Sequence, residues 1–286
     1  MASPRKLNPG DGAKKLRSNK VVYVSNNCAD THLVSDADHE LARRVAVETG
    51  HILLEVRERL GAKGVDPKVM KDEGDLAAHN YIQSIFLAER PNDGFLSEEG
   101  ANNLERLQAT RTWIIDPLDG TREFSEPPRV DWAVHIALVV NQLPVVGAVA
   151  LPGEDVVLAT GSELTVPKAP GEKPRVIVSR TRRPAPAVQL ADALNAEYIE
   201  MGSAGAKAMA VVQGQADIYA HAGGQYEWDS CAPVAVAQAA GLHCSRLDGS
   251  PMLYNNADPY LPDLLICRPE WADKSLKILA ESFQAK

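Results

Sequence analysis

Cysteine and aromatic residues are scarce in this 286-residue chain, and long apolar runs are missing. Its four cysteines (Cys28, Cys231, Cys244 and Cys267) form no Cys-x-x-Cys pair, which argues against structural zinc and against a disulfide framework. No apolar run approaches the roughly 18 residues that cross a bilayer, and the polar, basic N-terminus is unlike a secretory signal. We therefore expect a reduced, cytoplasmic protein without a membrane segment.

The net charge argues against further classes of protein. The formal net charge is −8, which disfavours a general binder of nucleic acid or of anionic membranes. Apolar residues make up 45% and charged residues 24%, as in an ordinary globular protein. A small anionic substrate remains possible, because a bound metal can reverse the sign of charge locally.

Composition along the chain predicts a tail and two subdomains. Residues 1–20 are almost without apolar side chains, so we expect a flexible tail. Residues 161–174 combine Gly, Pro, Lys and Glu without periodicity, which is typical of a domain boundary. We expect an N-terminal α+β subdomain over residues 21–170 and a C-terminal α/β subdomain over residues 171–286.

Apolar periodicity places the main elements. A helix should begin after an N-cap at Ser35 and end at Gly61, and a second helix should begin at or near Asp75. Apolar runs over 132–140 and 144–151 predict a hairpin with a turn at Asn141-Gln142. The second half alternates strands with helices.

The stretch from Trp113 to Phe124 predicts the active site. Apolar residues lead into an acidic turn with Asp116 and Asp119, whose carboxylates would repel each other without a cation. Hard oxygen ligands suit Mg²⁺. Gly120 and Thr121 follow, offering backbone N–H groups and a hydroxyl to a phosphate oxygen. An ordinary surface turn is the alternative.

Three more acidic residues are candidates for the same site. Asp75 and Asp229 each fall near a predicted helix start, where capping alone would explain an aspartate. Adjacent glutamates in an extended chain point in different directions, so only one of Glu98 and Glu99 should face the aspartates; we favour Glu98. The turn at 202–205, with Lys207 after it, could hold an anion at a helix N-terminus, although tight packing also selects small residues.

Together these residues resemble the inositol monophosphatase superfamily of metal-dependent, lithium-sensitive phosphatases. That family pairs an Asp-Pro-x-Asp-Gly-Thr turn with an upstream Glu-Glu and a later Trp-Asp, and all three occur here in this order. The resemblance covers residues 36–280 and implies a layered αβαβα sandwich of the α/β (α+β) class, often homodimeric.

Within the superfamily, the sequence most resembles the CysQ-type 3′-phosphoadenosine-5′-phosphate phosphatases. Glu123 stands where inositol monophosphatases usually have Asn, and the segments 202–207 and 228–233 are similar to those of bisphosphate nucleotidases. One segment departs from that branch: the usual Ser-Arg-Ser-His is Ser179-Arg180-Thr181-Arg182 here, where Arg182 could contact a phosphate.

The resemblance also implies roles. Two or three Mg²⁺ ions would be held by Glu98, Asp116, Asp119, Asp229 and the carbonyl of Leu118, and Li⁺ would inhibit. Glu98, Thr121 and Asp75 would act on the attacking water. The substrate-side residues would be Gly120, Thr121, Ser179, Arg180, Ser203 and Lys207.

The implied reaction is hydrolysis of 3′-phosphoadenosine 5′-phosphate, and possibly of its 5′-phosphosulfate, to AMP and phosphate in sulfur assimilation. The alternatives are an inositol-1-phosphate or fructose-1,6-bisphosphate phosphatase with the same metal site, and a catalytically silent metal- or nucleotide-binding regulator. The substrate cavity separates these activities, because the metal residues are common to them.

Overall fold

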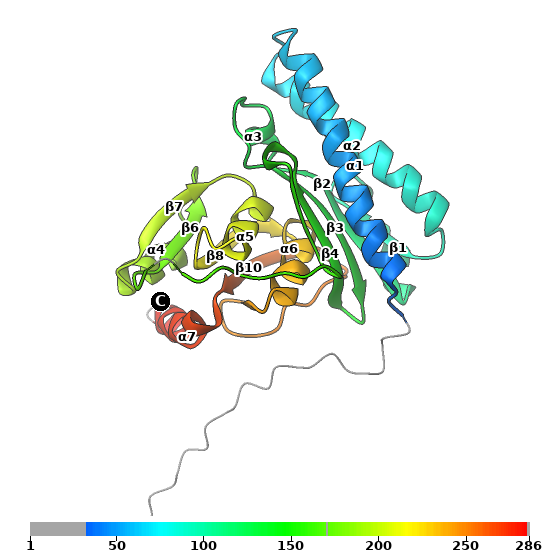
Figure 1. The fold of residues 1–286 in the computed structure, drawn as a ribbon. Coiled ribbons are helices and arrows are strands. Elements are labelled where there is room, and N and C mark those ends of the chain that lie inside the picture. The colour runs from blue at the N-terminus through cyan, green and yellow to red at the C-terminus, as the bar shows by residue number, and fades with distance from the viewer. Residues whose placement is uncertain (1–32, 170, 285–286) are drawn as a thin grey trace, which may run out of the picture.

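Two five-stranded mixed sheets form the framework of the protein (Figure 1). The computed structural model describes residues 33–169 and 171–284, so the predicted N-terminal tail lies outside the described residues. Strand order is β1-β2-β3-β4-β5 in the first sheet and β7-β6-β8-β10-β9 in the second. The predicted boundary at 161–174 falls between the two sheets. The division of the chain into two subdomains remains a prediction.

The first half contains the helices α1 (Asp36–Gly61), α2 (Pro67–Glu89) and α3 (Thr121–Phe124), the 3-10 helices η1 (Leu104–Gln108) and η2 (Pro152–Glu154), and the strands β1 (Gly94–Ser97), β2 (Arg111–Asp119), β3 (Ala133–Val140), β4 (Leu143–Leu151) and β5 (Val156–Ala159). The second half contains the helices α4 (Ala185–Ala193), α5 (Ala204–Val212), α6 (Glu227–Ala239) and α7 (Pro269–Gln284), and the strands β6 (Arg175–Ser179), β7 (Glu197–Met201), β8 (Ile218–Tyr226), β9 (His243–Ser245) and β10 (Tyr260–Cys267).

Three apolar clusters show how the layers stack. One cluster joins α1 and α2 to one face of the first sheet, and another joins α4 and α7 to the outer face of the second sheet. The cluster between the sheets contains α5 and α6. Successive side chains of β2 point to opposite faces of the sheet, which separates the first cluster from the middle one. Trp113 and Ile115 face α1 and α2, while Ile114 faces the middle layer. The predicted αβαβα sandwich is confirmed.

Helix α6 belongs to the second half of the chain but packs on the first sheet. Gly147 of β4 permits the close approach, because a Cβ there would lie 2.7 Å from the carbonyl oxygen of Ala232. The two sheets therefore share one continuous core.

The helix predictions are partly confirmed. Helix α1 begins after Ser35 and ends at Gly61, as expected. The predicted start of α2 near Asp75 is wrong, because the helix begins at Pro67. Asp66 caps it by accepting a 2.8 Å hydrogen bond from the N–H of Lys68, and a proline at the first helical position needs no partner for its nitrogen. Asp75 therefore lies within the helix, and capping does not explain it.

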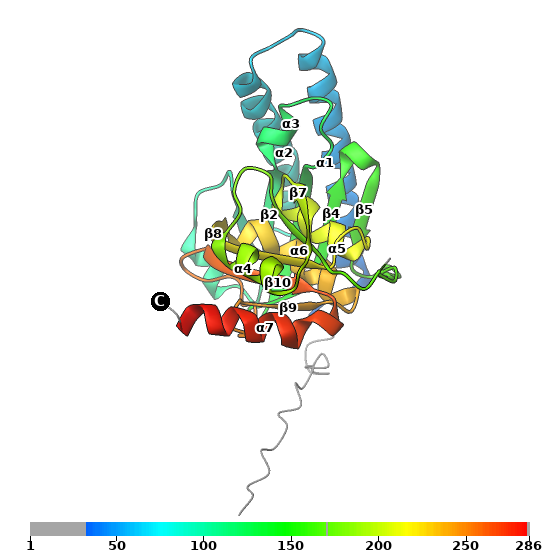
Figure 2. The ribbon, with the colours of Figure 1, turned by 90° about the vertical axis from the view of Figure 1, so that its left-hand side faces the viewer.

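The hairpin of β3 and β4 forms as predicted. Asn141 and Gln142 have φ angles of 51° and 64°, the left-handed conformation of a two-residue hairpin turn. In Figure 2 the far ends of α1 and α2 project beyond the rest of the protein, with α3 beside them. None of the helices in the described ranges has the length and apolar content needed to cross a membrane.

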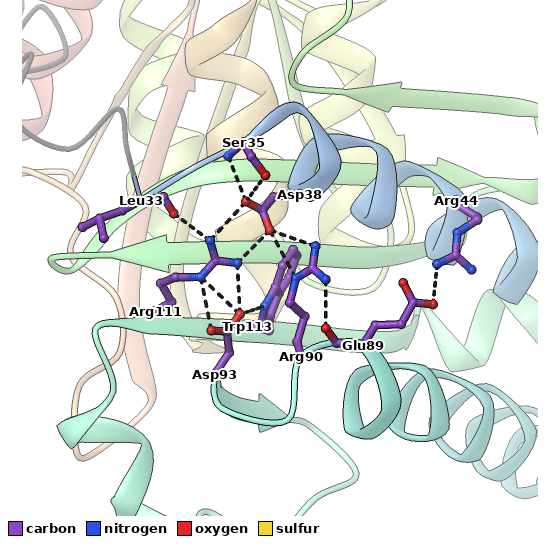
Figure 3. A network of polar contacts seen from close by, with 9 residues as sticks. All are labelled: Leu33, Ser35, Asp38, Arg44, Glu89, Arg90, Asp93, Arg111 and Trp113. Atoms are coloured by element: carbon purple, nitrogen blue, oxygen red, sulfur yellow. Dashed lines mark hydrogen bonds and ion pairs between the residues drawn. The ribbon is translucent and has the colours of Figure 1, made fainter.

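A buried ion-pair network fixes the start of α1 against the first sheet (Figure 3). Asp38 accepts hydrogen bonds from Arg111 at 2.7 Å and from Arg90 at 3.1 Å, while the N–H of Ser35 bonds it at 2.9 Å. Asp93 bonds both Arg111 and the indole of Trp113. Burial alone would raise the pKa of Asp38, but the hydrogen bonds from Arg111 and Ser35 outweigh it and hold that pKa well below its usual value.

Replacing Asp38 should therefore destabilise the fold. We expect Asp38→Asn to lower the free energy of unfolding by about 2 to 3 kcal/mol, less than for a fully buried pair because both arginines partly reach solvent. The folded-state pKa of Asp38 is depressed, so its contribution is present above about pH 4 and is lost as the pH falls further. Urea unfolding at pH 7 and at pH 3.5 measures both effects. The exposed Glu40→Gln is the control, and equal stability of the two variants would contradict the assignment.

Candidate active site

Parallel pairing of β1 with β2 brings Glu98 beside Asp116. Ser97 pairs with Ile115, and the N–H of Glu98 donates to the carbonyl of Ile115 at 3.2 Å. The residues after each strand end therefore meet at one edge of the sheet, where the carboxyl groups of Glu98 and Asp116 share a hydrogen bond. The charge of Glu99 raises the pKa of Asp75, and the charge of Glu98 does so to a smaller extent.

The acidic segment is an irregular continuation of β2 rather than the separate turn expected from its sequence. Pairing with β3 shifts between Asp116 and Asp119, and the carboxylate of Asp116 accepts the N–H of Leu118 at 3.1 Å. Gly120 has a φ of 86°, which favours glycine, and starts α3. A Cβ at Gly120 would lie 3.0 Å from the Cβ of Ser203. The segment thus turns sharply against the second half of the chain.

The first turn of α6 supplies the third aspartate. Asp229 caps this helix by accepting the N–H of Tyr226 at 2.7 Å, as its position in the sequence suggested. The same carboxylate faces the other two: one oxygen each from Asp116, Asp119 and Asp229 lie within 4.8 Å of one another. Asp229 therefore both caps α6 and contributes a carboxylate to the acidic cluster.

Crowding makes these carboxyl groups difficult to ionise. Burial, together with the charge of Asp119, raises the pKa of Asp229 to about 8. Burial and the same charge raise the pKa of Glu98 to about 7, although its hydrogen bond with Asp116 acts in the opposite direction. Burial and the neighbouring acids also raise the pKa of Asp116 well above its usual value. A divalent cation would relieve this repulsion, and an all-oxygen set of carboxylates suits Mg²⁺.

The N-terminus of α5, predicted to hold an anion, holds Asp119. The carboxylate accepts the N–H groups of Gly205 at 2.6 Å and Ala204 at 3.1 Å, and the hydroxyl of Ser203 also donates to it. Ser203 has a φ of 50°, a strained value for a residue with a side chain, and its Oγ accepts the N–H of Ala206. An acidic residue from the first sheet thus fills this anion site.

A cavity of about 390 Å³ opens between this junction and the second sheet. Asp119, Asp229, Gly120 and Ser203 belong to its wall, with Ala204 beside them. The remaining lining residues come from the second half of the chain: Ser179, Thr181, Arg182, Lys207, Tyr219, His221, Gly224 and Gln225. Sequence reasoning had selected Ser179 and Lys207 from this second set, and had named Arg182 as a possible phosphate contact.

Two predicted substrate-side residues are occupied by contacts within the protein. Arg180 bonds Glu123 at 2.6 Å and Glu126 at 2.8 Å, and it does not line the cavity. Lys207 is buried and donates to the carbonyls of Gly202, at 3.1 Å, and of Ser203. Burial lowers the pKa of Lys207, while the surrounding acids, Asp119 first, oppose that shift.

The sequence analysis missed His135, which lies fully buried beneath the aspartates. Its Nδ1 is 3.0 Å from the carbonyl oxygen of Trp228, and its Nε2 is 3.4 Å from Asp119. No hydrogen-bond partner for Nε2 occurs in the described part of the chain. Burial lowers the pKa of His135, although Asp119 opposes the shift. Pairing the predicted hairpin with β2 would have found this residue, since His135 stands opposite Asp116.

Asp75 reaches the site from the middle of α2. Gly74 beside it lets the helix approach β2 and α3 closely, because a Cβ there would lie 2.7 Å from the ring of Phe124 and 3.1 Å from Leu118. Burial, then the charges of Glu99 and Glu98, raises the pKa of Asp75 to about 7. Such a carboxyl group can exchange a proton near neutral pH.

An acidic cluster at a strand end, aimed into a cavity between two sheets, is the arrangement of a metal-dependent phosphatase fold. Residues 36–283 match the inositol monophosphatase family, and the chain belongs to it. The resemblance seen in the sequence is therefore confirmed.

Individual relatives show which members of the family this chain is most usefully compared with. A 3′-phosphoadenosine 5′-phosphate phosphatase of Mycobacterium tuberculosis (strain CDC 1551 / Oshkosh) is 48% identical over 245 residues, covering 83% of this chain and 91% of the relative. The 3′(2′),5′-bisphosphate nucleotidase CysQ of Escherichia coli (strain K12) is 30% identical over 235 residues, covering 76% and 94%. The crystal structure of CysQ from Bacteroides thetaiotaomicron superposes with a TM-score of 0.69 at 27% identity, covering 82% and 98%.

A substitution at Gly205 tests the contact between Gly205 and His135 beneath the aspartates. The ring of His135 occupies the space where a Cβ on Gly205 would lie, so we expect Gly205→Ala to displace the ring from its place beside Asp119. Overpacking of this kind costs about 1 to 3 kcal/mol of stability. We expect a lower midpoint of thermal unfolding and weaker Mg²⁺ binding by calorimetry. Gly61→Ala, with open space around its Cβ, is the control; unchanged Mg²⁺ affinity in Gly205→Ala would contradict the role of this contact.

Proposed function

We propose that this protein is a Mg²⁺-dependent, Li⁺-sensitive phosphatase that hydrolyses 3′-phosphoadenosine 5′-phosphate to AMP and phosphate in sulfur assimilation. The observation that carries the proposal is the trio Asp116, Asp119 and Asp229, two of which line the wall of the cavity. The names of the 48% and 30% identical relatives support a bisphosphorylated nucleotide as substrate. The 5′-phosphosulfate is a second nucleotide to test.

Bound Mg²⁺ would neutralise charge on the transferred phosphoryl group and lower the pKa of a water molecule. The trio would hold the ions together with Glu98 and the carbonyl of Leu118. Gly120 and Thr121, at the start of α3, would donate to the phosphate. Asp75, with its pKa near neutrality, would take a proton from the attacking water, and the hydroxyl of Thr121 would help to orient that water. The homodimer implied by the family resemblance and the cytoplasmic location expected from the sequence belong to the same proposal, and measuring mass in solution tests the homodimer.

The deciding experiment is phosphate release from three substrates: 3′-phosphoadenosine 5′-phosphate, inositol 1-phosphate and fructose 1,6-bisphosphate. Each is measured with Mg²⁺, with EDTA, and with Mg²⁺ plus Li⁺. We expect kcat/KM for the nucleotide to exceed that for the others by more than about tenfold, or ~1.4 kcal/mol in transition-state binding.

The alternatives give different results in the same assay. A preference for either of the other two substrates would replace the nucleotidase proposal with that activity on the same metal residues. Nucleotide binding by calorimetry without turnover of any substrate would show a silent binding protein.

Asp75 has its own test. We expect Asp75→Asn to reduce kcat by about 10²- to 10⁴-fold with a smaller change in KM, because a general base is lost. Since Asp75 works deprotonated, the kcat of the parent should fall as the pH drops below about 7, the pKa to which burial and the nearby glutamates raise it. Mg²⁺ bound at Glu98 would neutralise that charge and lower the pKa of Asp75, so kcat would then fall at a lower pH. Asp72→Asn, one turn earlier and paired with Lys68 at the surface, is the control. Retention of most of the kcat in Asp75→Asn would exclude this role.

A further inference from the structure

Helix α6 carries Asp229 in its first turn and a proline, Pro233, in its interior. A proline has no N–H to donate to the carbonyl four residues earlier, and its ring crowds that carbonyl. The residue four positions before Pro233 is Asp229 itself. The turn that carries the third aspartate therefore lacks one of its helix hydrogen bonds and depends on partners from elsewhere in the fold.

Two fully buried side chains supply such partners. Glu227, the first residue of α6, accepts the N–H groups of Asn255 at 2.6 Å and Asn256 at 2.8 Å, which joins the turn to the loop before β10. His135 of β3 places its Nδ1 3.0 Å from the carbonyl oxygen of Trp228, the residue before Asp229. A carbonyl oxygen can only accept, so Nδ1 is the nitrogen that carries the hydrogen. His135 thus links the first sheet to the start of α6.

The same imidazole ring also lies against the other two aspartates. Its Nε2 is 3.4 Å from a carboxylate oxygen of Asp119, and its Nδ1 is 3.8 Å from one of Asp116. A Cβ on Gly205 would lie 1.9 Å from Nε2, so the ring fills the space beside the N–H of Gly205, which donates to Asp119 at 2.6 Å. The ring therefore contacts every element that carries or holds one of the three aspartates.

We propose that His135 is a positioning residue, which fixes Asp119 and Asp229 at the separation that binds Mg²⁺ by holding the carbonyl of Trp228 from beneath. The inference rests on the metal dependence of the proposed function. His135 is not part of the cavity lining, so it acts through the two carboxylates and contacts no substrate. Partners behind the ligands of a metal orient those ligands, and loss of one such partner typically weakens metal binding by about 10- to 100-fold.

The test measures Mg²⁺ binding by calorimetry for the parent, His135→Asn, His135→Gln and His135→Leu. The amide of Asn can place an N–H near the position of Nδ1, the longer Gln places its amide near Nε2, and Leu has no donor. We expect His135→Gln and His135→Leu to bind Mg²⁺ about 10- to 100-fold more weakly, and His135→Asn to stay within about threefold of the parent. His39→Leu is the matched control, since the Nδ1 of this histidine lies 2.8 Å from the hydroxyl of Thr160 instead.

The Mg²⁺ dependence of phosphate release separates positioning from a general loss of stability. In His135→Gln the Mg²⁺ concentration for half-maximal activity should rise by the same factor as the dissociation constant, while kcat at saturating Mg²⁺ stays within about threefold, since the ligands themselves are intact. Loss of folded enzyme alone would lower kcat and leave the half-saturating concentration unchanged.

Two results would overturn the role of His135 while leaving the metal-dependent function intact. One is parent-like Mg²⁺ affinity in His135→Gln and His135→Leu. The other is a loss in His135→Asn as large as in His135→Gln, because the hydrogen bond to Trp228 would then not be the cause. If His135→Leu does not fold, the comparison of Asn with Gln decides alone. A parent protein that binds no Mg²⁺ would overturn the proposed metal dependence and this inference together.

Discussion

The contact between Asp119 and the N-terminus of α5 is the constraint on which the site depends. A strand of the first sheet ends in a carboxylate that accepts hydrogen bonds from Ser203, Ala204 and Gly205 of the second half. Asp131 adds a 2.6 Å bond from the N–H of Gly202. These contacts hold the strained backbone of Ser203 and fix the cavity wall at the same time. Packing of the two halves and geometry of the site therefore cannot vary independently.

Electrostatic strain in the folded protein is concentrated where the metal is proposed to bind. Glu98, Asp116 and Asp229 all have raised pKa values because burial removes water while like charges remain close. Such a cluster costs stability by itself, and sites of this kind are commonly functional. The acidic protein can still accept an anionic substrate, because bound metal ions would supply positive charge at the site.

Local signals in the sequence were sufficient for much of this arrangement. The strand before Asp116, the hairpin turn at Asn141 and the helix start at Asp229 follow from short-range patterns. The choice of Glu98 was supported by the family resemblance, and its place beside β2 depends on a parallel pairing that only the structure shows. The failures came from long-range contacts. The turn at 202–205 looked like a site for a substrate anion, but a residue over 80 positions earlier fills it.

Other features depended on partners far away in the sequence. Asp75 looked like a cap because the real start of α2, at Asp66-Pro67, was overlooked, and its position within the helix depends on Gly74 packing against Phe124. Arg180 could not be recognised as the partner of Glu123 without the fold, and His135 required knowledge of strand pairing.

The packing of α6 on β4 has a consequence for how the chain folds as it is synthesised. When the first sheet has left the ribosome, α1 and α2 can cover one of its faces, but the face that receives α6 is still bare. Residues 227–239 complete that face, and Gly147 leaves the space in which they fit. The N-terminal half therefore cannot complete the apolar core on this face of its sheet until residues 227–239 have been synthesised.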